Sequence, residues 1–378
     1  MPGGFVSHRE RLALAWSFRE PDRVPIEMGL SPELRRHPKA GWLAELVDQH
    51  ADNFVCLWGV GQGFLGFPST YRETVIEDRP GEYRRLERVH ETLAGAFRAV
   101  TVHPAGDSDF HWEKRFVSAL DDLRRLAETP RPPIPIDPEG WRKASEQLGD
   151  RGFPLVSLFH PLGALVRNAT MEEMYAWLCE ERDLVHRYLA AANDQVARAV
   201  EESLEAGIGP CFITWAHEMF IPPWLGQRAF DEFVFPYDKR LADVIHRQGG
   251  KWRIHCHGRC MEFLEKFADM GLDAIEPLEP PPAGDVDLAE AKRRVGHRMM
   301  LSGNILAQWY ARMTPQDVRQ NVQQAILTAA PGGGFSLRDS SGGPFVDNWM
   351  SPDDVERVLK NCEEFVLAGL EYGQYPIG

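Results

Sequence analysis

The stretch KWRIHCHGRCMEFLEKFADMGLDAIEPLEP (residues 251–280) contains the unit that decides the fold. An apolar run at 251–258 predicts a strand, residues 260–270 follow the spacing of a helix, and an apolar run at 273–280 predicts the next strand. Strands that alternate with helices pair in parallel within one sheet. This stretch therefore predicts a parallel α/β fold.

The same unit repeats from about residue 150 onward. Six apolar runs, each followed by a helical pattern, are PLVSLF (154–159), CFITWAHE (211–218), KWRIHCHG (251–258), DAIEPLEP (273–280), RMMLSGN (298–304) and GGFSLRD (333–339). Strand candidates at 23–28 and 53–58 bring the number to eight, which predicts a TIM (β/α)8 barrel. A doubly wound open sheet is the alternative, but no glycine fingerprint of the dinucleotide-binding kind follows the first strand.

Three segments depart from this repeat. Residues 7–19 predict an N-terminal helix, and residues 71–116 consist of short polar strands separated by turns, which is typical of a β insertion. A proline-rich connector follows at 129–140. We expect a single TIM-barrel domain over 1–378, with an N-terminal helical extension and a polar β insertion that covers the barrel mouth or contacts another subunit.

Composition narrows the classes of function. The chain has 378 residues, 42 of them basic and 56 acidic, and a formal net charge of -14. No basic stripe is present, which argues against nucleic acid as a partner. No apolar window is long enough for a membrane helix, and the N-terminus lacks the apolar core of a signal peptide. We therefore expect a cytoplasmic enzyme that acts on a small-molecule substrate.

Active sites of TIM barrels lie at the C-terminal ends of the strands. In the run at 251–258, Arg253, His255 and His257 share one face of the strand, the face that would point into the barrel. Two imidazoles so placed can bind one divalent metal such as zinc. They could equally be core histidines that are satisfied by hydrogen bonds.

Carboxylates follow on the next strand. Glu276 and Glu279 end the run at 273–280, and a carboxylate there could complete a two-histidine metal site with one open position. The alternative is that both are solvated loop acids or pair with an arginine.

Two other strand ends carry candidate site residues. His217 and Glu218 close the run at 211–218, and one of them could transfer protons while the other caps a helix. Trp215 could line a pocket for a flat substrate or pack in the core. His160 follows the run at 154–159 and could face the same mouth.

The last two predicted strands also end in candidate site residues. Asn304 follows Gly303, and a small residue there would let a substrate approach the backbone, unless this is an ordinary turn. Arg338 and Asp339 precede a Ser/Gly loop of a kind that can bind an anion through backbone N–H groups. We expect Arg338 to hold an anionic group of the substrate and Asp339 to take part in catalysis.

These segments, in this order, resemble the uroporphyrinogen decarboxylase superfamily. The resemblance rests on the H-x-[CH]-G strand (His255, His257, Gly258), a GLDA…E segment, LSGN before a TPQDV helix start, and GGGFSL. It covers roughly residues 150–370, and REPDRVPIEM resembles the family's opening strand. The resemblance implies a TIM barrel and agrees with a homodimer.

The superfamily has two chemical branches. Decarboxylases act on a tetrapyrrole without metal or cofactor, and an RQAGR-type segment after the opening strand holds the substrate carboxylates. Here that stretch is MGLSPE (28–33), with no arginine before Arg35. The other branch contains zinc-dependent methyltransferases that work with corrinoid proteins and a thiol acceptor. The missing arginines favour this second branch.

The resemblance also implies a ligand set. The ligands of the methyltransferase branch fall on His255, on His257 in place of a cysteine, on Glu279, and on Ser340 or Ser341 in place of a second cysteine, with Asp339 as a candidate fourth ligand. A site of nitrogen and oxygen ligands is a stronger Lewis acid than a thiolate site, and it lowers the pKa of a bound thiol, water or alcohol.

Three functions remain open. The first is zinc-dependent methyl transfer to or from a thiol or oxygen nucleophile, with a corrinoid carried by a partner protein. The second is a cofactor-free decarboxylase of a tetrapyrrole or another poly-acid. The third is a non-catalytic barrel that binds a tetrapyrrole or a corrinoid.

Overall fold

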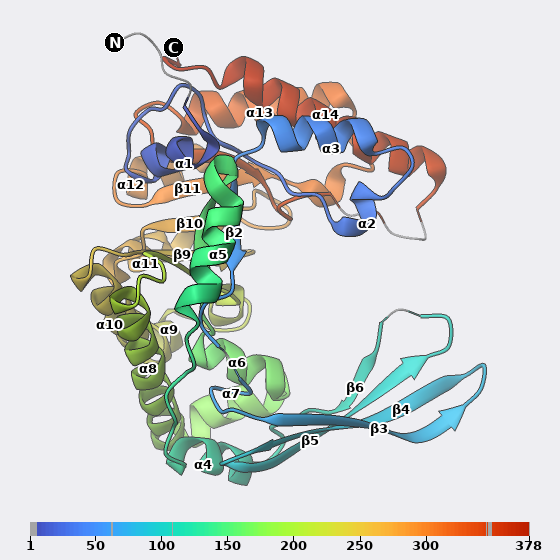
Figure 1. Ribbon diagram of the computed structural model, residues 1–378, viewed down its shortest axis with the longest axis vertical. Helices are drawn as coiled ribbons and strands as arrows, with labels where there is room; N and C mark the ends of the chain where they lie inside the picture. The colour runs from blue at the N-terminus through green and yellow to red at the C-terminus, as the bar shows by residue number, and fades with distance from the viewer. Residues whose placement is uncertain (1–5, 62, 108, 345, 347–349, 378) are drawn as a thin grey trace.

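Eight parallel strands form a nearly closed barrel surrounded by helices (Figure 1). The computed structural model describes residues 6–61, 63–107, 109–344, 346 and 350–377. Around the sheet the strands follow the order β1 (Ile26–Glu27), β12 (Phe335–Asp339), β11 (Met300–Ile305), β10 (Ala274–Pro277), β9 (Lys251–Cys256), β8 (Cys211–Thr214), β7 (Gly152–Ser157) and β2 (Asn53–Leu57). Each of the eight predicted runs overlaps one of these strands, so the TIM-barrel prediction is confirmed.

Helices connect the strands on the outside of the barrel. Those of the repeat are α5 (Pro138–Leu148), α6 (Pro161–Asn168), α7 (Met171–Glu180), α8 (Arg182–Glu205), α9 (Gln227–Phe233), α10 (Phe235–Arg247), α11 (Leu264–Met270), α12 (Leu288–Val295), α13 (Pro315–Ala329) and α14 (Pro352–Tyr372). Short 3-10 turns are η1 (Gly149–Arg151), η2 (His217–Phe220), η3 (Met261–Phe263) and η4 (Ala307–Trp309). Within the described ranges, every helix falls short of the length or hydropathy needed to cross a bilayer.

The N-terminal segment packs across the barrel as the expected helical extension. It contains α1 (His8–Trp16), α2 (Pro32–Arg35) and α3 (Gly41–His50). Ser7 begins α1 because its hydroxyl accepts from the Glu10 N–H while the Glu10 carboxylate accepts from Ser7, which is a capping box.

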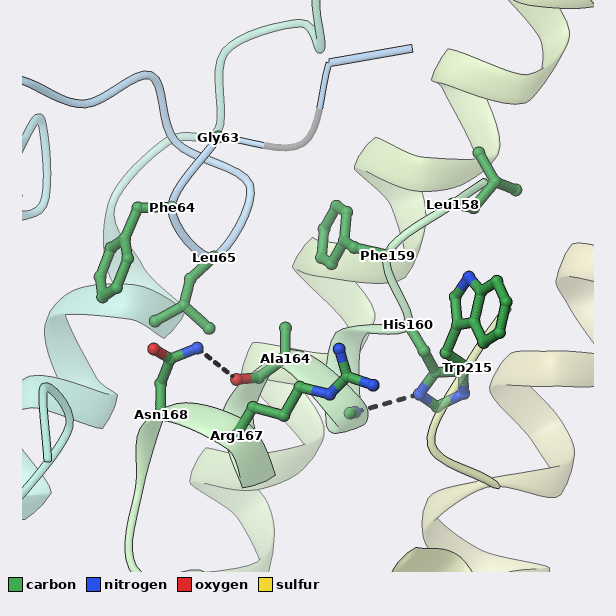
Figure 2. Close-up of a pocket in the computed structure, with 11 residues that line it drawn as sticks. Gly63, Phe64, Leu65, Leu158, Phe159, His160, Ala164, Arg167, Asn168 and Trp215 are labelled. Atoms are coloured by element: carbon green, nitrogen blue, oxygen red, sulfur yellow. Dashed lines mark hydrogen bonds between the residues drawn. The ribbon is translucent and has the colours of Figure 1, made fainter. Parts of the chain in front are cut away.

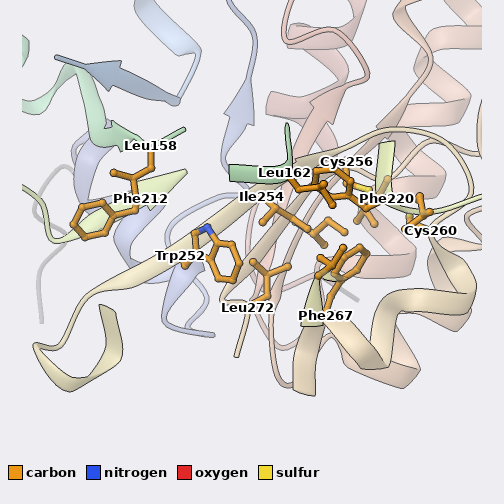
Figure 3. Packing of buried hydrophobic residues seen from close by; sticks show 14 of the residues in the cluster. Leu158, Leu162, Phe212, Phe220, Trp252, Ile254, Cys256, Cys260, Phe267 and Leu272 are labelled. Atoms are coloured by element: carbon orange, nitrogen blue, oxygen red, sulfur yellow. The ribbon is translucent and has the colours of Figure 1, made fainter. Parts of the chain in front are cut away.

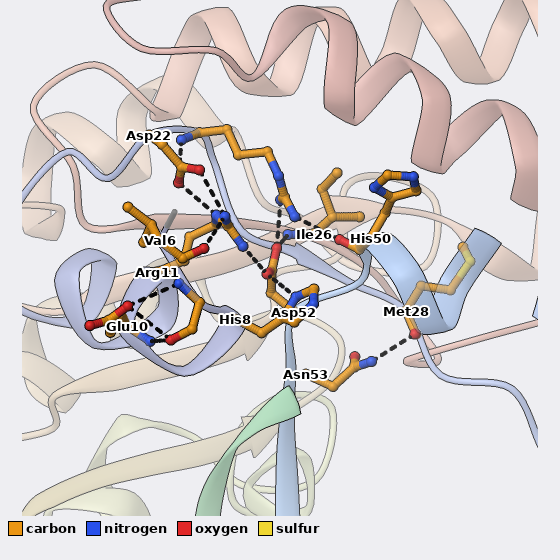
Figure 4. Close-up of polar contacts among 12 residues, drawn as sticks. Val6, His8, Glu10, Arg11, Asp22, Ile26, Met28, His50, Asp52 and Asn53 are labelled. Atoms are coloured by element: carbon orange, nitrogen blue, oxygen red, sulfur yellow. Dashed lines mark hydrogen bonds and ion pairs between the residues drawn. The ribbon is translucent and has the colours of Figure 1, made fainter. Parts of the chain in front are cut away.

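Asp52 joins the two ends of the sheet, β1 and β2 (Figure 4). Its backbone N–H donates to the carbonyl of Ile26 (2.6 Å), and its carboxylate accepts from the Ile26 N–H (3.0 Å). The same buried carboxylate also accepts from Arg11 (2.7 Å) and Arg23 (2.6 Å), and lies 2.7 Å from His8 Nδ1. Asp52 thus links β1 to β2, two strands that form no ladder with each other among the described residues.

The polar insertion forms a separate antiparallel sheet. Its strands are β3 (Thr70–Arg79), β4 (Tyr83–Thr92), β5 (Gly95–Pro104) and β6 (His111–Lys114), and α4 (Leu120–Glu128) lies at its base. The sheet projects away from the barrel as an arm (Figure 1). Phe97 of β5 anchors it, with its ring centroid 5.3 Å from that of Phe64 in the loop after β2.

The two faces of β9 divide as the alternation predicted. Trp252, Ile254 and Cys256 are fully buried and pack among the apolar side chains outside the barrel, including Phe267 (Figure 3). Arg253 lies on the opposite face and points into the barrel, where it contacts carboxylates. The inward face of β9 therefore contributes a charged group to the barrel interior.

We expect Asp52→Ala to lower the free energy of unfolding by about 3–5 kcal/mol, because the buried Arg23 loses its carboxylate partner. Burial alone would raise the pKa of Asp52, but His8, Arg23 and Arg11 outweigh it and lower the pKa. The contribution is therefore present above the ordinary pKa of an aspartate and is lost as the pH falls.

Denaturant unfolding at neutral and acidic pH measures both effects. Asp48→Ala is the matched control, since Asp48 forms an exposed ion pair with Arg35 and its loss should change stability little. Equal losses in the two variants would contradict the role of Asp52.

Candidate functional site

Four charged side chains fill the barrel interior below the mouth. Arg253 Nη2 lies 2.7 Å from Glu27 Oε2 and 2.9 Å from Glu276 Oε2. Arg338 Nη1 lies 3.2 Å from Glu27 Oε2, and its Nε contacts Glu276. Two guanidinium groups thus face two carboxylates, so the charges of this network balance.

Burial and pairing shift the pKa values in the network. Burial alone would lower the pKa of Arg253, but the charges of Glu27 and Glu276 outweigh it and raise the pKa. Burial would likewise raise the pKa of Glu276, yet Arg338, Arg253 and a hydrogen bond with His255 hold it well below its ordinary value. Glu276 is therefore ionised at neutral pH and accepts hydrogen bonds from its neighbours.

Two histidines at the end of β9 face two carboxylates at the end of β10. His255 lies in β9 and His257 just after it, while Glu276 lies in β10 and Glu279 just after it. His255 Nδ1 lies 3.2 Å from Glu276 Oε1, and His257 Nδ1 lies 3.1 Å from Glu279 Oε2. Glu279 also accepts from the backbone N–H of Gly258 at 3.0 Å. The two imidazole centroids are 4.4 Å apart, edge to face. The structure thus brings together His255, His257 and Glu279.

Negative charge surrounds His257. Its hydrogen bond with Glu279 raises its pKa, burial opposes this, and the charges of Glu279, Glu218 and Glu276 raise it further. Glu218 Oε2 is buried and has no hydrogen-bond partner among the described residues. Two imidazoles beside an unpaired carboxylate oxygen form a donor set that suits a divalent cation.

A second histidine cluster lies behind the mouth. Asp238 of α10 lies with Oδ1 2.7 Å from His160 Nε2 and Oδ2 3.1 Å from His217 Nε2, and all three side chains are buried. Among the described residues, these three are the one group of His, Cys, Asp or Glu whose ligand atoms all lie within 4.8 Å of one another, so the cluster could hold a metal ion.

Most hydrogen-bonding atoms of this second cluster already have partners, whereas the buried His217 Nδ1 has none among the described residues. His160 Nδ1 accepts from the Gly163 N–H at 3.2 Å, so its Nε2 carries the proton that is donated to Asp238. Burial would raise the pKa of Asp238, but both imidazoles lower it to about 2. Burial lowers the pKa of His217, which keeps that ring neutral. A metal ion bound here would have to replace the protons that the two Nε2 atoms donate to Asp238.

Three predicted catalytic residues take different positions. The strand predicted over 211–218 ends at Thr214, because Ala216 has a positive φ of 77° and η2 begins at the next residue. His217 is consequently turned toward the helix layer and is 0% exposed, whereas Glu218 stays near His257. Asp339 is also buried, and its Oδ1 accepts from the N–H groups that follow it at 341 and 343, so it shapes the Ser/Gly loop.

The predicted substrate-contacting residues separate into three places. Arg338 belongs to the charge-balanced network. Asn304 lines a cavity of about 480 Å³ beside α12 and α13. His160 and Trp215 line a second cavity of about 190 Å³ next to the mouth (Figure 2). Ser340, one of the aligned ligand positions, donates to Gln308 and faces η4 instead.

Two residues of these clusters escaped the sequence analysis. Glu27 ends the first strand, and the same strand-end rule that selected the other sites could have found it. Asp238 lies inside a helix, 78 positions from His160, and no local pattern marks it. Only the folded chain brings it to the two imidazoles.

We expect Arg253→Met to lower the free energy of unfolding by about 3–5 kcal/mol, because Glu27 and Glu276 then share a buried excess of negative charge. Adding Glu27→Gln should recover part of this loss by restoring the balance of charge. Chemical denaturation of the single and double variants tests this. A double variant that is no more stable than Arg253→Met would contradict it.

The chain is similar to proteins of one known family. A sequence model of the uroporphyrinogen decarboxylase (URO-D) family matches residues 157–364. A uroporphyrinogen decarboxylase of Dechloromonas aromatica is 29% identical over 34% of this chain, which spans only 35% of that protein. One of Methylococcus capsulatus is 26% identical, with 65% of this chain and 69% of that protein covered.

A solved structure shares the fold over nearly the whole chain. It is a methyltransferase from Methanosarcina mazei, with a TM-score of 0.59, 14% sequence identity, and 97% of this chain and 99% of that chain covered. At this identity the likeness shows the TIM-barrel fold alone. Because the family match covers more than half of the sequence, the chain belongs to the uroporphyrinogen decarboxylase family.

Proposed function

We propose that the chain is a metal-dependent methyltransferase of this family, with His255 and His257 as ligands of a divalent cation, zinc first among them. The observation that supports the proposal is the pairing of each imidazole Nδ1 with a carboxylate. A carboxylate that accepts from Nδ1 fixes the tautomer in which Nε2 carries the lone pair that binds a metal.

The carboxylates around the histidines divide the remaining roles. Glu276 and Glu279 orient the two rings through their contacts with the two Nδ1 atoms. Glu218 supplies a buried oxygen without a partner, whose negative charge a cation would neutralise. The ligand atoms of the His160–Asp238–His217 cluster lie closer together, but both of its Nε2 atoms already face Asp238.

A bound divalent cation supplies Lewis acidity, which lowers the pKa of a thiol or hydroxyl group at the site. Methyl transfer follows from the resemblance to the corrinoid-linked branch, with the methyl donor on a corrinoid protein that docks at the barrel mouth. The interior network is consistent with this branch, since Arg253 and Arg338 already face Glu27 and Glu276. Neither cation is free to bind the carboxylates of a poly-acid.

We expect the purified protein to contain roughly one divalent metal ion per chain, and we expect His255→Ala/His257→Ala to lose it. Asp238→Asn is the matched control, because it disrupts the buried cluster and leaves both mouth histidines in place. Elemental analysis together with thermal melts measures content and folding. Metal that disappears in Asp238→Asn but persists in the double variant would place the ion in the buried cluster instead.

We expect the zinc-loaded protein to transfer the methyl group of methylcobalamin to a thiol, and the His255→Ala/His257→Ala variant to lose this activity. The loss of the methyl–cobalt bond is followed by absorbance. A protein that binds no zinc and releases CO2 from uroporphyrinogen would instead be a cofactor-free decarboxylase. One that binds the tetrapyrrole without turnover would be a carrier.

A further inference from the structure

The cavity of about 190 Å³ beside the mouth has features that the proposed metal site does not use (Figure 2). The loop after β2 forms one wall, the end of β7 and the start of α6 form a second, and Trp215 forms a third. The Trp215 ring centroid lies 5.1 Å from that of His255. The cavity therefore adjoins the histidines that we assign to the cation.

Arg167 gives the cavity its charge. Of the described residues that line the cavity, it alone carries a permanent charge, and its guanidinium is directed into the cavity (Figure 2). It is exposed, and none of the described residues accepts a hydrogen bond or forms an ion pair with its side chain. This contrasts with Arg253 and Arg338, each of which contacts two carboxylates.

The other polar groups of the wall are engaged. His160 uses both ring nitrogens, one toward Gly163 and one toward Asp238. Asn168 donates its amide to the carbonyl of Ala164 at 2.8 Å. Arg167 is therefore the group left to meet a charged ligand in a protein whose formal net charge is -14.

The remaining wall is apolar and partly aromatic, formed by Phe64, Leu65, Leu158, Phe159 and Trp215. Its volume of about 190 Å³ exceeds the roughly 150 Å³ of an apolar cavity known to hold one benzene molecule. One flat ring with a small charged substituent matches both the size and the lining. An oligo-acid the size of a tetrapyrrole does not.

We infer that this cavity binds a small molecule with a flat apolar body and a single anionic group, which pairs with Arg167 while the body contacts Phe159 and Trp215. The inference rests on the proposed function in one respect, because it names the substrate class that would lie beside His255. The guanidinium would donate two hydrogen bonds to a carboxylate, a geometry that favours planar anions.

Binding of benzoate and of its neutral analogue benzamide, measured by isothermal titration with the full-length protein, tests this inference. We expect Arg167→Gln to weaken benzoate binding by about tenfold or more, the range of a charge-assisted hydrogen bond, and to leave benzamide unaffected. Arg167→Lys should recover part of the loss. Arg228→Gln in α9 is the matched control, an exposed arginine outside the cavity, and should bind benzoate as the wild type does.

Three results would overturn the inference: no benzoate binding at millimolar concentration, equal binding of benzoate and benzamide, or equal binding of benzoate to wild type and Arg167→Gln. Titrations with and without zinc separate it from the proposed function. A protein that takes up no zinc but binds benzoate through Arg167 retains the inference and loses the metalloenzyme. A protein that loads zinc at the histidines and ignores benzoate loses the inference alone.

Discussion

The ion pairs of Arg253 are the constraint on which the barrel interior depends. A guanidinium that is 1% exposed can stay in this interior only because Glu27 and Glu276 face it at 2.7 and 2.9 Å. Arg338 and Arg253 together lower the pKa of Glu276 and keep it ionised, and an ionised Glu276 accepts from His255. The orientation of the first mouth histidine thus follows from a charge that lies deeper in the barrel.

The sequence analysis recovered the features that depend on local period. Alternation along residues 252–257 separated the apolar face of β9 from the face that carries Arg253 and His255, and the strand–helix repeat predicted the barrel. The periodic pattern gave a wrong strand end at residues 211–218, because one residue there has an unusual backbone angle. The positive φ of Ala216 ends β8 early and turns His217 outward, which no pattern of residue types around it signals.

The sequence analysis also could not predict which charged side chains pair with one another. The sequence analysis treated Arg338 as free to bind a substrate anion. Whether an arginine is already paired with a carboxylate depends on which residues lie near it in the folded chain. Glu27 approaches Arg338 from more than three hundred residues away. Asp238 meets His160 and His217 in the same way, from the middle of a helix. Such pairings depend on tertiary contacts, whereas strand-end positions such as His255 do not.

Phe64 has a place in two parts of the molecule. Its ring forms a wall of the cavity beside the mouth, and it also stacks 4.2 Å from His90 of β4 and packs against Phe97 at the root of the projecting sheet. A movement of the Phe64 ring would therefore change both the cavity wall and the packing at the root of the arm. A partner that binds the strands of the arm would therefore act close to a ring that a ligand in the cavity also contacts.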